Sequence, residues 1–482
     1  MSDRSHPAPL KSQSTRGKKP RRNDELTLNI DALAQGGAGV GRADGFVLFV
    51  PLTAPGDRAR VRVARTHKRH AEGELLQVEQ PSESRVEPEC PYFGKCGGCA
   101  WQHLSYEAQL SAKEDLVRES FERLSDLSTD LPLSKIIPSP EKLRYRNKME
   151  LSFHPKAGLG FHRRGFFDQV VQVDECLLAS AAISRILREV ASFVDKHELP
   201  LWNSRDHVGL MRHLVLRESK GTGELMVGLV TTSDPFPQAA ELAETLVTLE
   251  PRVAAVVRAI TDARADAVGV ESLEVLHGRD HIFEILGGIR FRVGLETFFQ
   301  TNTLQAERMG SIVEEMSDLK GNENVVDLFC GVGTFALLLA RKAARVLGLE
   351  ISHSAIESAR MTAQREGIDN VELMTGDARR GLPQLLAQLG CPPDLLILDP
   401  PRSGAGGKVM RRIGRSGAKR VIYVSCNPST LAPDLAWLVP FGYRIDAVQP
   451  IDLFPQTHHV ETIVRLDRLP EADEILDPFK GS

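Results

Sequence analysis

Asp327-Leu328-Phe329-Cys330-Gly331-Val332-Gly333-Thr334 is the stretch that decides the fold, because it joins a buried-strand run to an apolar helix through a glycine-rich turn. The strand run is Val325 to Phe329, and the helical run is Phe335 to Arg341. Further strand candidates alternate with helical stretches; they are Arg345 to Leu349, Val371 to Met374, Leu395 to Leu398 and Val421 to Val424. This alternation predicts a doubly wound, largely parallel, Rossmann-like α/β domain over residues 296–470.

Acidic residues follow two of these strands, at the sheet edge where such folds bind ligands. Glu350 ends the second strand, where its carboxylate can accept hydrogen bonds from both hydroxyls of a ribose. Asp377 lies just past the third strand and is placed to contact an adenine amino group. The alternative is that both are merely exposed strand-end acids. Because Phe335 and Ala336 follow Gly333-Thr334, the phosphate-cradling G-x-G-x-x-G of NAD enzymes is absent, which favours S-adenosylmethionine, a cofactor without phosphate.

The N-terminal part of the chain differs in composition and in its pattern of apolar residues. Residues 1–23 are polar and basic with almost no large apolar side chains, and we expect a disordered tail. Residues 24–82 hold about five short strand candidates separated by turns, which predicts a small closed β-barrel of the oligonucleotide-binding type. Its glycines at 36, 37, 39 and 41 are not a dinucleotide fingerprint, because no helix follows them. Residues 83–295 mix strand and helix patterns and predict a central α+β domain, and residues 471–482 form a C-terminal tail.

Three cysteines cluster between these parts, as Cys90-x5-Cys96-x2-Cys99 in a stretch rich in proline and glycine. This is a metal-binding pattern that needs a fourth ligand, and Cys176 is the nearest candidate in sequence. Four thiolates suit either tetrahedral zinc or a [4Fe–4S] cluster, and the spacing does not choose between them.

The chain has 482 residues, too many for one core, and its 42% hydrophobic and 26% charged residues are typical of a soluble multidomain protein. No apolar run approaches the ~20 residues of a membrane-spanning helix, and we expect a cytoplasmic monomer with no membrane partner. Its net charge of −4 does not indicate a nucleic-acid binder, so if RNA is the partner, the positive charge that contacts its phosphates must be local. Three basic runs could supply them, or could be solvated surface: Lys11 to Arg22, Arg58 to Arg69, and Arg144 to Lys148 with Arg163-Arg164.

Cys426 is the strongest candidate for chemistry, because it lies in Ser425-Cys426-Asn427-Pro428 at the end of a predicted strand beside the cofactor edge. A thiol there, with carboxylates nearby, indicates covalent catalysis. The alternative is that Cys426 is a small buried hydrophobe, as lone cysteines often are. Cys330 is the competing thiol, but it lies inside the glycine-rich turn and is expected to be a packing residue.

Asp399-Pro400-Pro401-Arg402, the Ser-Cys-Asn-Pro segment and the final His459-Val460-Glu461, in that order, resemble the RNA (uracil-5-)-methyltransferases that use S-adenosylmethionine. The resemblance runs from about Glu25 to Arg465. It implies that Cys426 is the nucleophile and Glu461 the general base, although His458 and His459 could also be argued as bases. By the same match, Gln300 in Phe298-Phe299-Gln300-Thr301-Asn302 contacts the cofactor, Phe329 packs on it, and Asp399 lies beside its methionine end.

The resemblance also implies that the barrel is a TRAM domain and that Cys90, Cys96, Cys99 and Cys176 bind a [4Fe–4S] cluster, with zinc as the alternative. Having both features makes the chain look most like the subgroup that methylates uridine C5 in 23S ribosomal RNA. Transfer RNA is the alternative substrate. Two rival functions remain: a non-catalytic RNA-binding protein with a redox-sensing cluster, and a methyltransferase for exocyclic amines. The latter enzymes use an aromatic residue where this chain has Arg402, and no nucleophilic cysteine.

Overall fold

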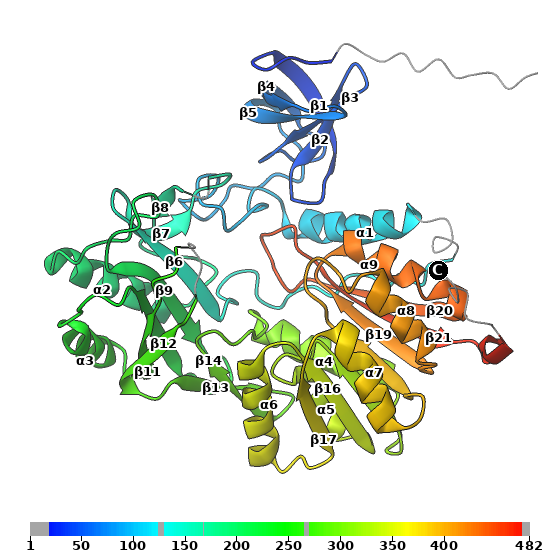
Figure 1. The fold of residues 1–482 in the computed structure, drawn as a ribbon. Helices are drawn as coiled ribbons and strands as arrows, with labels where there is room; N and C mark the ends of the chain where they lie inside the picture. Colours follow the sequence, from blue (N-terminus) through cyan, green and yellow to red (C-terminus); the bar gives the residue numbers. More distant parts are fainter. Residues whose placement is uncertain (1–18, 124–129, 167, 265–268, 475–482) are drawn as a thin grey trace, which may run out of the picture. The chain divides into compact units, whose positions relative to one another are not determined.

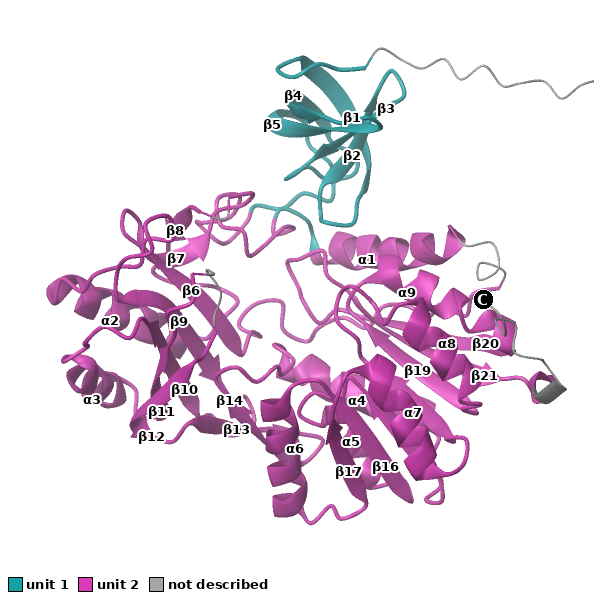
Figure 2. Cartoon of the chain, in the orientation of Figure 1, with its two compact units in different colours: residues 1–87, 103–105 teal, residues 88–102, 106–482 magenta. Residues whose placement is uncertain are grey.

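The computed structural model describes residues 19–123, 130–166, 168–264 and 269–474, and the chain divides into two compact units (Figure 2). The first unit holds the chain up to Glu87 together with His103–Ser105, and the second holds the remainder. Residues 1–18 of the predicted basic tail and residues 475–482 of the predicted C-terminal tail lie outside the described residues.

The first unit is the predicted five-stranded closed barrel, with strand order β1-β2-β3-β5-β4. Its strands are β1 (Glu25–Leu33), β2 (Gly39–Ala43), β3 (Phe46–Val50), β4 (Arg58–Thr66) and β5 (His70–Gln80). Side chains alternate along β4, so that Ala59, Val61 and Val63 are fully buried inside the barrel. A glycine is needed at position 39, the first residue of β2, because a Cβ atom there would lie 2.0 Å from Thr53 Oγ1.

The central part of the second unit is a seven-stranded sheet in the order β12-β11-β10-β9-β6-β7-β8 (Figure 1). Its strands are β6 (Lys148–His154), β7 (Gly158–His162), β8 (Val170–Gln172), β9 (Met211–Glu218), β10 (Leu225–Thr231), β11 (Val253–Ile260) and β12 (Ser272–Gly278). Helices α2 (Ala181–Lys196) and α3 (Ala239–Leu249) pack on one face through a shared apolar cluster. The hairpin β13 (His281–Leu286) and β14 (Ile289–Gly294) packs on the other face.

The C-terminal part is the predicted α/β domain, a seven-stranded sheet in the order β17-β16-β15-β18-β19-β21-β20. Five strands are parallel to one another: β15 (Asn324–Leu328), β16 (Arg345–Glu350), β17 (Val371–Thr375), β18 (Leu395–Leu398) and β19 (Arg420–Ser425). The final pair, β20 (Tyr443–Ile451) and β21 (Glu461–Arg468), is antiparallel, and β21 lies antiparallel beside β19. This antiparallel end is what brings the last strand of the chain back to the end of β19.

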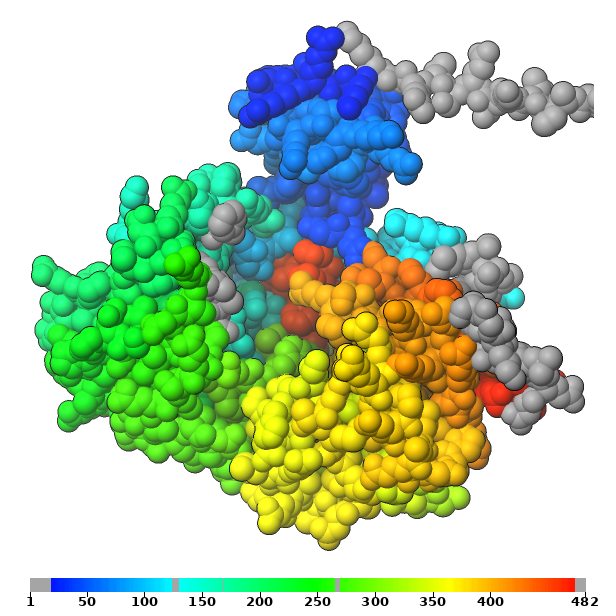
Figure 3. Space-filling view, in the orientation of Figure 1, coloured from blue at the N-terminus to red at the C-terminus, as the bar shows by residue number. Residues whose placement is uncertain are grey.

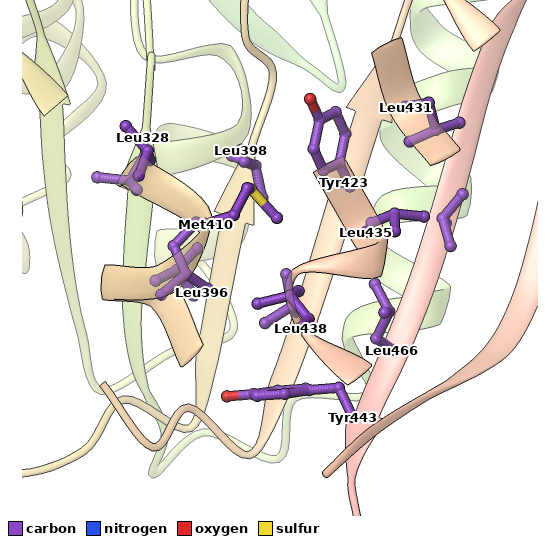
Figure 4. Close-up of a cluster of buried hydrophobic side chains, with 14 of the residues drawn as sticks. Leu328, Leu396, Leu398, Met410, Tyr423, Leu431, Leu435, Leu438, Tyr443 and Leu466 are labelled. Carbon is purple, nitrogen blue, oxygen red and sulfur yellow. The ribbon is translucent and has the colours of Figure 1, made fainter. Parts of the chain in front are cut away.

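Helices cover both faces of this sheet. One face holds α4 (Thr303–Ser317), α5 (Thr334–Ala340) and α6 (His353–Glu366). The other face holds α7 (Ala378–Leu389), α8 (Gly407–Arg415) and α9 (Pro428–Ala436), whose apolar side chains meet those of the strands in the cluster of Figure 4. Two short 3₁₀ helices, Val439–Phe441 and Pro470–Glu474, flank the last two strands.

Helix α1 (Tyr106–Glu122) belongs to the C-terminal sheet and not to the central one, although its sequence lies in the range 83–295. Val117 and Phe121 are fully buried in the same cluster as α9. After the helix, Leu133 and Ile137 form parallel bridges to β20. The predicted central range therefore contributes one helix and one edge segment to the domain that follows it.

Candidate active site

The site lies where the carboxyl ends of the parallel strands meet. The registers place the end of β15 between the ends of β16 and β18, and the end of β19 beside β18. The antiparallel pairing of Ser425 with Thr462 then sets Cys426, one residue past β19, across from Glu461, the first residue of β21. In the space-filling view, red residues near the end of the C-terminal part lie in a hollow between the green central part and the yellow and orange part of the same unit (Figure 3). Residues predicted from separate segments are thus brought to one edge.

The glycine-rich turn after β15 has the backbone conformation of a ligand-binding loop. Phe329, Gly331 and Gly333 all have positive φ angles, of 62°, 55° and 79°, and a non-glycine residue such as Phe329 rarely adopts one. The amide of Gly331 donates to Glu350 Oε2 at 3.2 Å, and Ser352 donates to Oε1 at 2.9 Å. Glu350 therefore lies against the loop with its orientation fixed. Cys330 is buried in the core and is a packing residue.

Two of the three other predicted cofactor contacts, Asp377 and Gln300, also have structural roles. Asp377 is the N-cap of α7, and its Oδ1 accepts from the Arg379 amide at 3.0 Å. Gln300 is 9% exposed and lies two residues before Asn302, the N-cap of α4; its carbonyl accepts from Asn147 Nδ2 at 2.8 Å. The structure places both residues near element ends.

Three carboxyl groups crowd the site, and their proximity changes their acidity. Burial raises the pKa of Asp399 to about 7, and burial followed by the charge of Asp399 raises the pKa of Glu461 to about 8. Asp327, the fully buried residue that begins the glycine-rich stretch, has a pKa well above its usual value, because of burial and then of Asp399. Sequence reasoning missed Asp327, although an acid inside an otherwise apolar strand run was a visible signal.

Cys426 is half-buried, and its thiol is held in the protonated form. Burial raises its pKa to about 12, and the charges of Glu461 and Asp399 add to this, whereas Arg402 opposes them. The next residue, Asn427, caps α9 and also donates from Nδ2 to the Arg402 carbonyl at 2.8 Å. The turn that carries the thiol is thereby bound to the Asp-Pro-Pro-Arg segment.

The two histidines before Glu461 are poor candidates for the base. Burial lowers the pKa of His458 to about 4 and that of His459 to about 3, so both rings are weak bases that stay neutral near pH 7. Nε2 of His459 lies 3.3 Å from Nη2 of Arg402, and a neutral imidazole can accept that hydrogen bond. Among the described residues, Arg402 is the only cation whose charge lowers the pKa of both Cys426 and Glu461. The contact with His459 holds that cation in place.

The four predicted metal ligands line one cavity of about 330 Å³ in the second unit. Burial raises the pKa of Cys99 to about 12, and Cys176, Cys96 and Cys90 raise it further through their charge. No three of these sulfur atoms lie within 4.8 Å of one another; among the described residues only His67, His70 and Glu72, at the start of β5, meet that condition. The cavity thus gathers the thiols without bringing them to the spacing of a compact single-ion site.

Within the described ranges, no helix is long and apolar enough to cross a membrane.

Comparisons with known proteins cover nearly the whole chain. Family models match a TRAM domain over residues 20–76 and a methyltransferase domain over residues 319–440. An RNA methyltransferase of Caldanaerobacter subterraneus is 36% identical over 450 residues, covering 92% of this chain and 98% of the relative. Another, of Halalkalibacterium halodurans, is 34% identical over 449 residues, covering 92% and 97%.

A solved structure matches over the same length. It is the Pyrococcus abyssi tRNA (uracil-54, C5)-methyltransferase in complex with S-adenosyl-L-homocysteine, with 28% sequence identity and a TM-score of 0.74. The match covers 92% of this chain and 100% of that one. The predicted TRAM barrel and the C-terminal methyltransferase domain are confirmed by these matches.

Proposed function

Because this chain belongs to the RNA (uracil-5-)-methyltransferase family, we propose that it methylates C5 of a uridine in RNA through a covalent bond between Cys426 and C6. The observation that carries the proposal is the placement of Cys426, just past the end of β19, across from Glu461 at the start of β21, beside the cofactor loop. A nucleophile and a base on facing strands can act on one pyrimidine ring between them.

The residues act in a fixed order. Uracil C5 is too weak a nucleophile to attack a methyl group unaided, so Cys426 Sγ first adds to C6 and the ring electrons move to C5. S-adenosylmethionine supplies the methyl group when bound and leaves as S-adenosylhomocysteine. Glu461 then takes the proton from C5, and the C6–S bond breaks, which restores the 5,6 double bond and releases the thiolate.

Ligand binding has to change the protonation of the site. With pKa values of about 12 and 8, Cys426 and Glu461 both keep their protons in the free protein at pH 7. Asp399 would hold the methionine end of the cofactor, whose positive sulfonium would, together with Arg402, favour the charged forms of both groups. We therefore expect cofactor binding to increase the reactivity of the thiol.

The cofactor contacts follow from the loop geometry. We assign the ribose hydroxyls to Glu350 and the adenine amino group to Asp377, since each acid follows a strand at the binding edge. By the family match we also assign Phe329 to pack on the cofactor, Gln300 to contact it, and Asp399 to lie beside its methionine end.

For the cysteine cavity we propose a [4Fe–4S] cluster rather than zinc. Zinc–sulfur bonds of about 2.3 Å place four tetrahedral thiolates all about 3.8 Å apart, whereas no three of these four sulfurs lie even within 4.8 Å of one another. A cubane spreads its four cysteines farther, because four iron atoms lie between them, and the 330 Å³ cavity offers that space. The methyl transfer needs no electron, so we assign the cluster a structural role that joins residues 90–99 to Cys176.

We propose 23S ribosomal RNA as the substrate, because the chain carries both a TRAM barrel and the four-cysteine cavity. Transfer RNA is the second candidate, favoured by the whole-length likeness to the Pyrococcus abyssi enzyme. Mapping 5-methyluridine in total RNA from a deletion strain decides between them: the modified site disappears from 23S ribosomal RNA or from transfer RNA.

Reaction of the purified protein with 5-fluorouridine RNA tests the mechanism. Fluorine at C5 cannot be removed by a base, so wild-type protein with cofactor is expected to form a stable adduct and Cys426→Ala none. Retained turnover in Cys426→Ala would refute the nucleophile. A methylated exocyclic amine in the product nucleoside would identify the rival enzyme class, and the absence of any methyl transfer would identify a non-catalytic RNA-binding protein.

A further inference from the structure

Residues 452–460 join β20 to β21 and end at Glu461; we call them the 452–460 loop. The loop is bound by groups that precede it by more than 300 residues. Lys113 Nζ donates to the Phe454 carbonyl at 3.0 Å, and the Tyr145 hydroxyl donates to the Pro455 carbonyl at 3.1 Å. The position of Glu461 therefore depends on how these distant groups hold the loop.

Gln456 is the most constrained residue of the 452–460 loop. Its φ of 69° lies in the left-handed region, which a glutamine adopts only when its surroundings enforce it. Its amide donates to Gln109 Oε1 at 2.9 Å, and its Oε1 accepts from Gln109 Nε2 at 3.0 Å. Its carbonyl accepts from the amides of Ala100 and Trp101, at 2.9 and 3.0 Å. One glutamine side chain and two consecutive backbone amides thus enforce the strained conformation.

The same groups connect the 452–460 loop to the segment that follows Cys99. Ala100 and Trp101 directly follow Cys99, and Gln109 Nε2 donates to the Trp101 carbonyl at 3.1 Å as well. Trp101 is fully buried, and its ring lies edge-on to that of His458, with centroids 6.4 Å apart. Gln109 itself is 1% exposed. A single buried side chain therefore bonds both the segment after Cys99 and the loop before Glu461.

We propose that Gln109 is a positioning residue for Glu461, and that it fixes the position of this base relative to the segment that follows Cys99. The inference rests on the proposed function, because it assigns Glu461 the removal of the C5 proton. Since Gln109 bonds the loop that ends at Glu461 and the segment after Cys99, its loss is expected to slow proton removal more than thiol addition or methyl transfer.

A Gln109→Met variant tests the proposal, because methionine has a similar volume and none of the three hydrogen bonds. Ser111→Ala, at an exposed position of the same helix, is the matched control. With 5-fluorouridine RNA, where no proton is removed, Gln109→Met is expected to form the adduct within about twofold of the wild-type rate. With uridine RNA, product release is expected to fall at least about tenfold, and a methylated protein–RNA adduct is expected to accumulate.

Two further variants make the result decisive. Glu461→Gln removes the base itself and is expected to accumulate the same adduct; if it does not, the proposed function fails rather than the role of Gln109. Gln109→Glu keeps an acceptor for the Gln456 amide and is expected to restore part of the release rate. If Gln109→Met slows adduct formation and product release equally, Gln109 is only a structural residue and the inference is overturned. The inference is also overturned if Gln109→Met releases product at the wild-type rate while Glu461→Gln accumulates adduct.

Discussion

Nζ of Lys113 lies 2.5 Å from Oδ1 of Asp452, and both side chains are completely buried. The Tyr106 hydroxyl donates to Oδ2 of the same carboxylate at 2.8 Å and accepts from the Ser139 amide at 2.7 Å. Burial lowers the pKa of Lys113, and the charge of Asp452 counteracts it. The pair therefore fastens α1 to the end of β20, where the 452–460 loop begins.

Replacing Lys113 with methionine is expected to destabilise the protein strongly. The substitution preserves the apolar stem but leaves the Asp452 carboxylate buried without a cation, which typically costs about 3–5 kcal/mol. Urea denaturation followed by tryptophan fluorescence measures the change. Adding Asp452→Asn removes the uncompensated charge, so the double variant is expected to be more stable than Lys113→Met alone. A loss below about 1 kcal/mol for Lys113→Met would contradict this account.

The same helix illustrates how far the sequence predicts the fold. Between residues 105 and 125, Leu110, Leu116, Val117 and Phe121 recur near helical spacing among charged residues, which predicts one amphipathic helix; the structure has α1 there. Periodicity says that one face is buried, but not which element covers it. Lys113 and its partner are separated by 339 residues, and no local pattern encodes such a pair. This is why the sequence predicts the helix but not its place on the C-terminal sheet.

The part of the candidate site that lies at the carboxyl ends of the parallel strands was predictable from the alternation of strands and helices in the sequence. Glu350 and Cys426 follow strands whose carboxyl ends must meet at one edge, so their proximity follows from the alternation of strands and helices. The role of Glu461 came only from the family resemblance, because the antiparallel return of β21 has no local signature. Asp327 and the group of His67, His70 and Glu72 were missed although both had a local signal, an acid in an apolar run and a close spacing of histidines and an acid; only the raised pKa of Asp327 depends on a residue from another strand end, Asp399.

The reactivity of Cys426 is expected to depend on its charged neighbours. Alkylation requires the thiolate, so its rate at pH 8.5 follows the thiol pKa. Because the charge of Glu461 raises that pKa and Arg402 lowers it, Glu461→Gln is expected to accelerate alkylation by iodoacetamide and Arg402→Ala to slow it, each by about threefold or more. Peptide mass spectrometry measures labelling at Cys426. Exposed Cys391 is the internal control and should not change. Changes of the opposite sign would show that access, rather than charge, sets the rate.

Glu461→Gln is expected to stabilise the protein above neutral pH. The pKa of Glu461 is raised from 4.5 to about 8 in the folded state, so the folded protein holds a proton that the unfolded chain releases as the pH rises above 4.5. Within that window the wild type loses about 1.4 kcal/mol per pH unit from this group, and the neutral glutamine loses none. The difference in Tm between variant and wild type should be small at pH 4.5, increase up to pH 8, and then remain constant. A difference independent of pH would contradict the raised pKa.

RNA binding by the barrel is expected to depend on the β4–β5 turn more than on β4 itself. Arg58, Arg60 and Arg62 face outward, but each lies within 4.0 Å of an acid: Arg58 with Glu79, Arg60 with Glu25, and Arg62 with Glu25 and Glu74. Their charges are therefore largely compensated. Exposed Lys68 and Arg69 form no ion pair with any residue that the structure describes, so they can displace counterions from phosphate.

Removing those two charges should therefore change the salt dependence of binding. Lys68→Ala with Arg69→Ala is expected to reduce the slope of log K against log salt by roughly 0.7–0.9 for each phosphate that the variant no longer neutralises. Filter binding at several salt concentrations measures the slope. The matched control, Arg60→Gln with Glu25→Gln, removes one charge of each sign and should leave the slope unchanged. If the control lowers the slope as much as the test pair does, then β4 rather than the turn binds the phosphates. The control leaves the net charge unchanged, so it can lower the slope only if Arg60 itself bonds a phosphate and displaces a counterion.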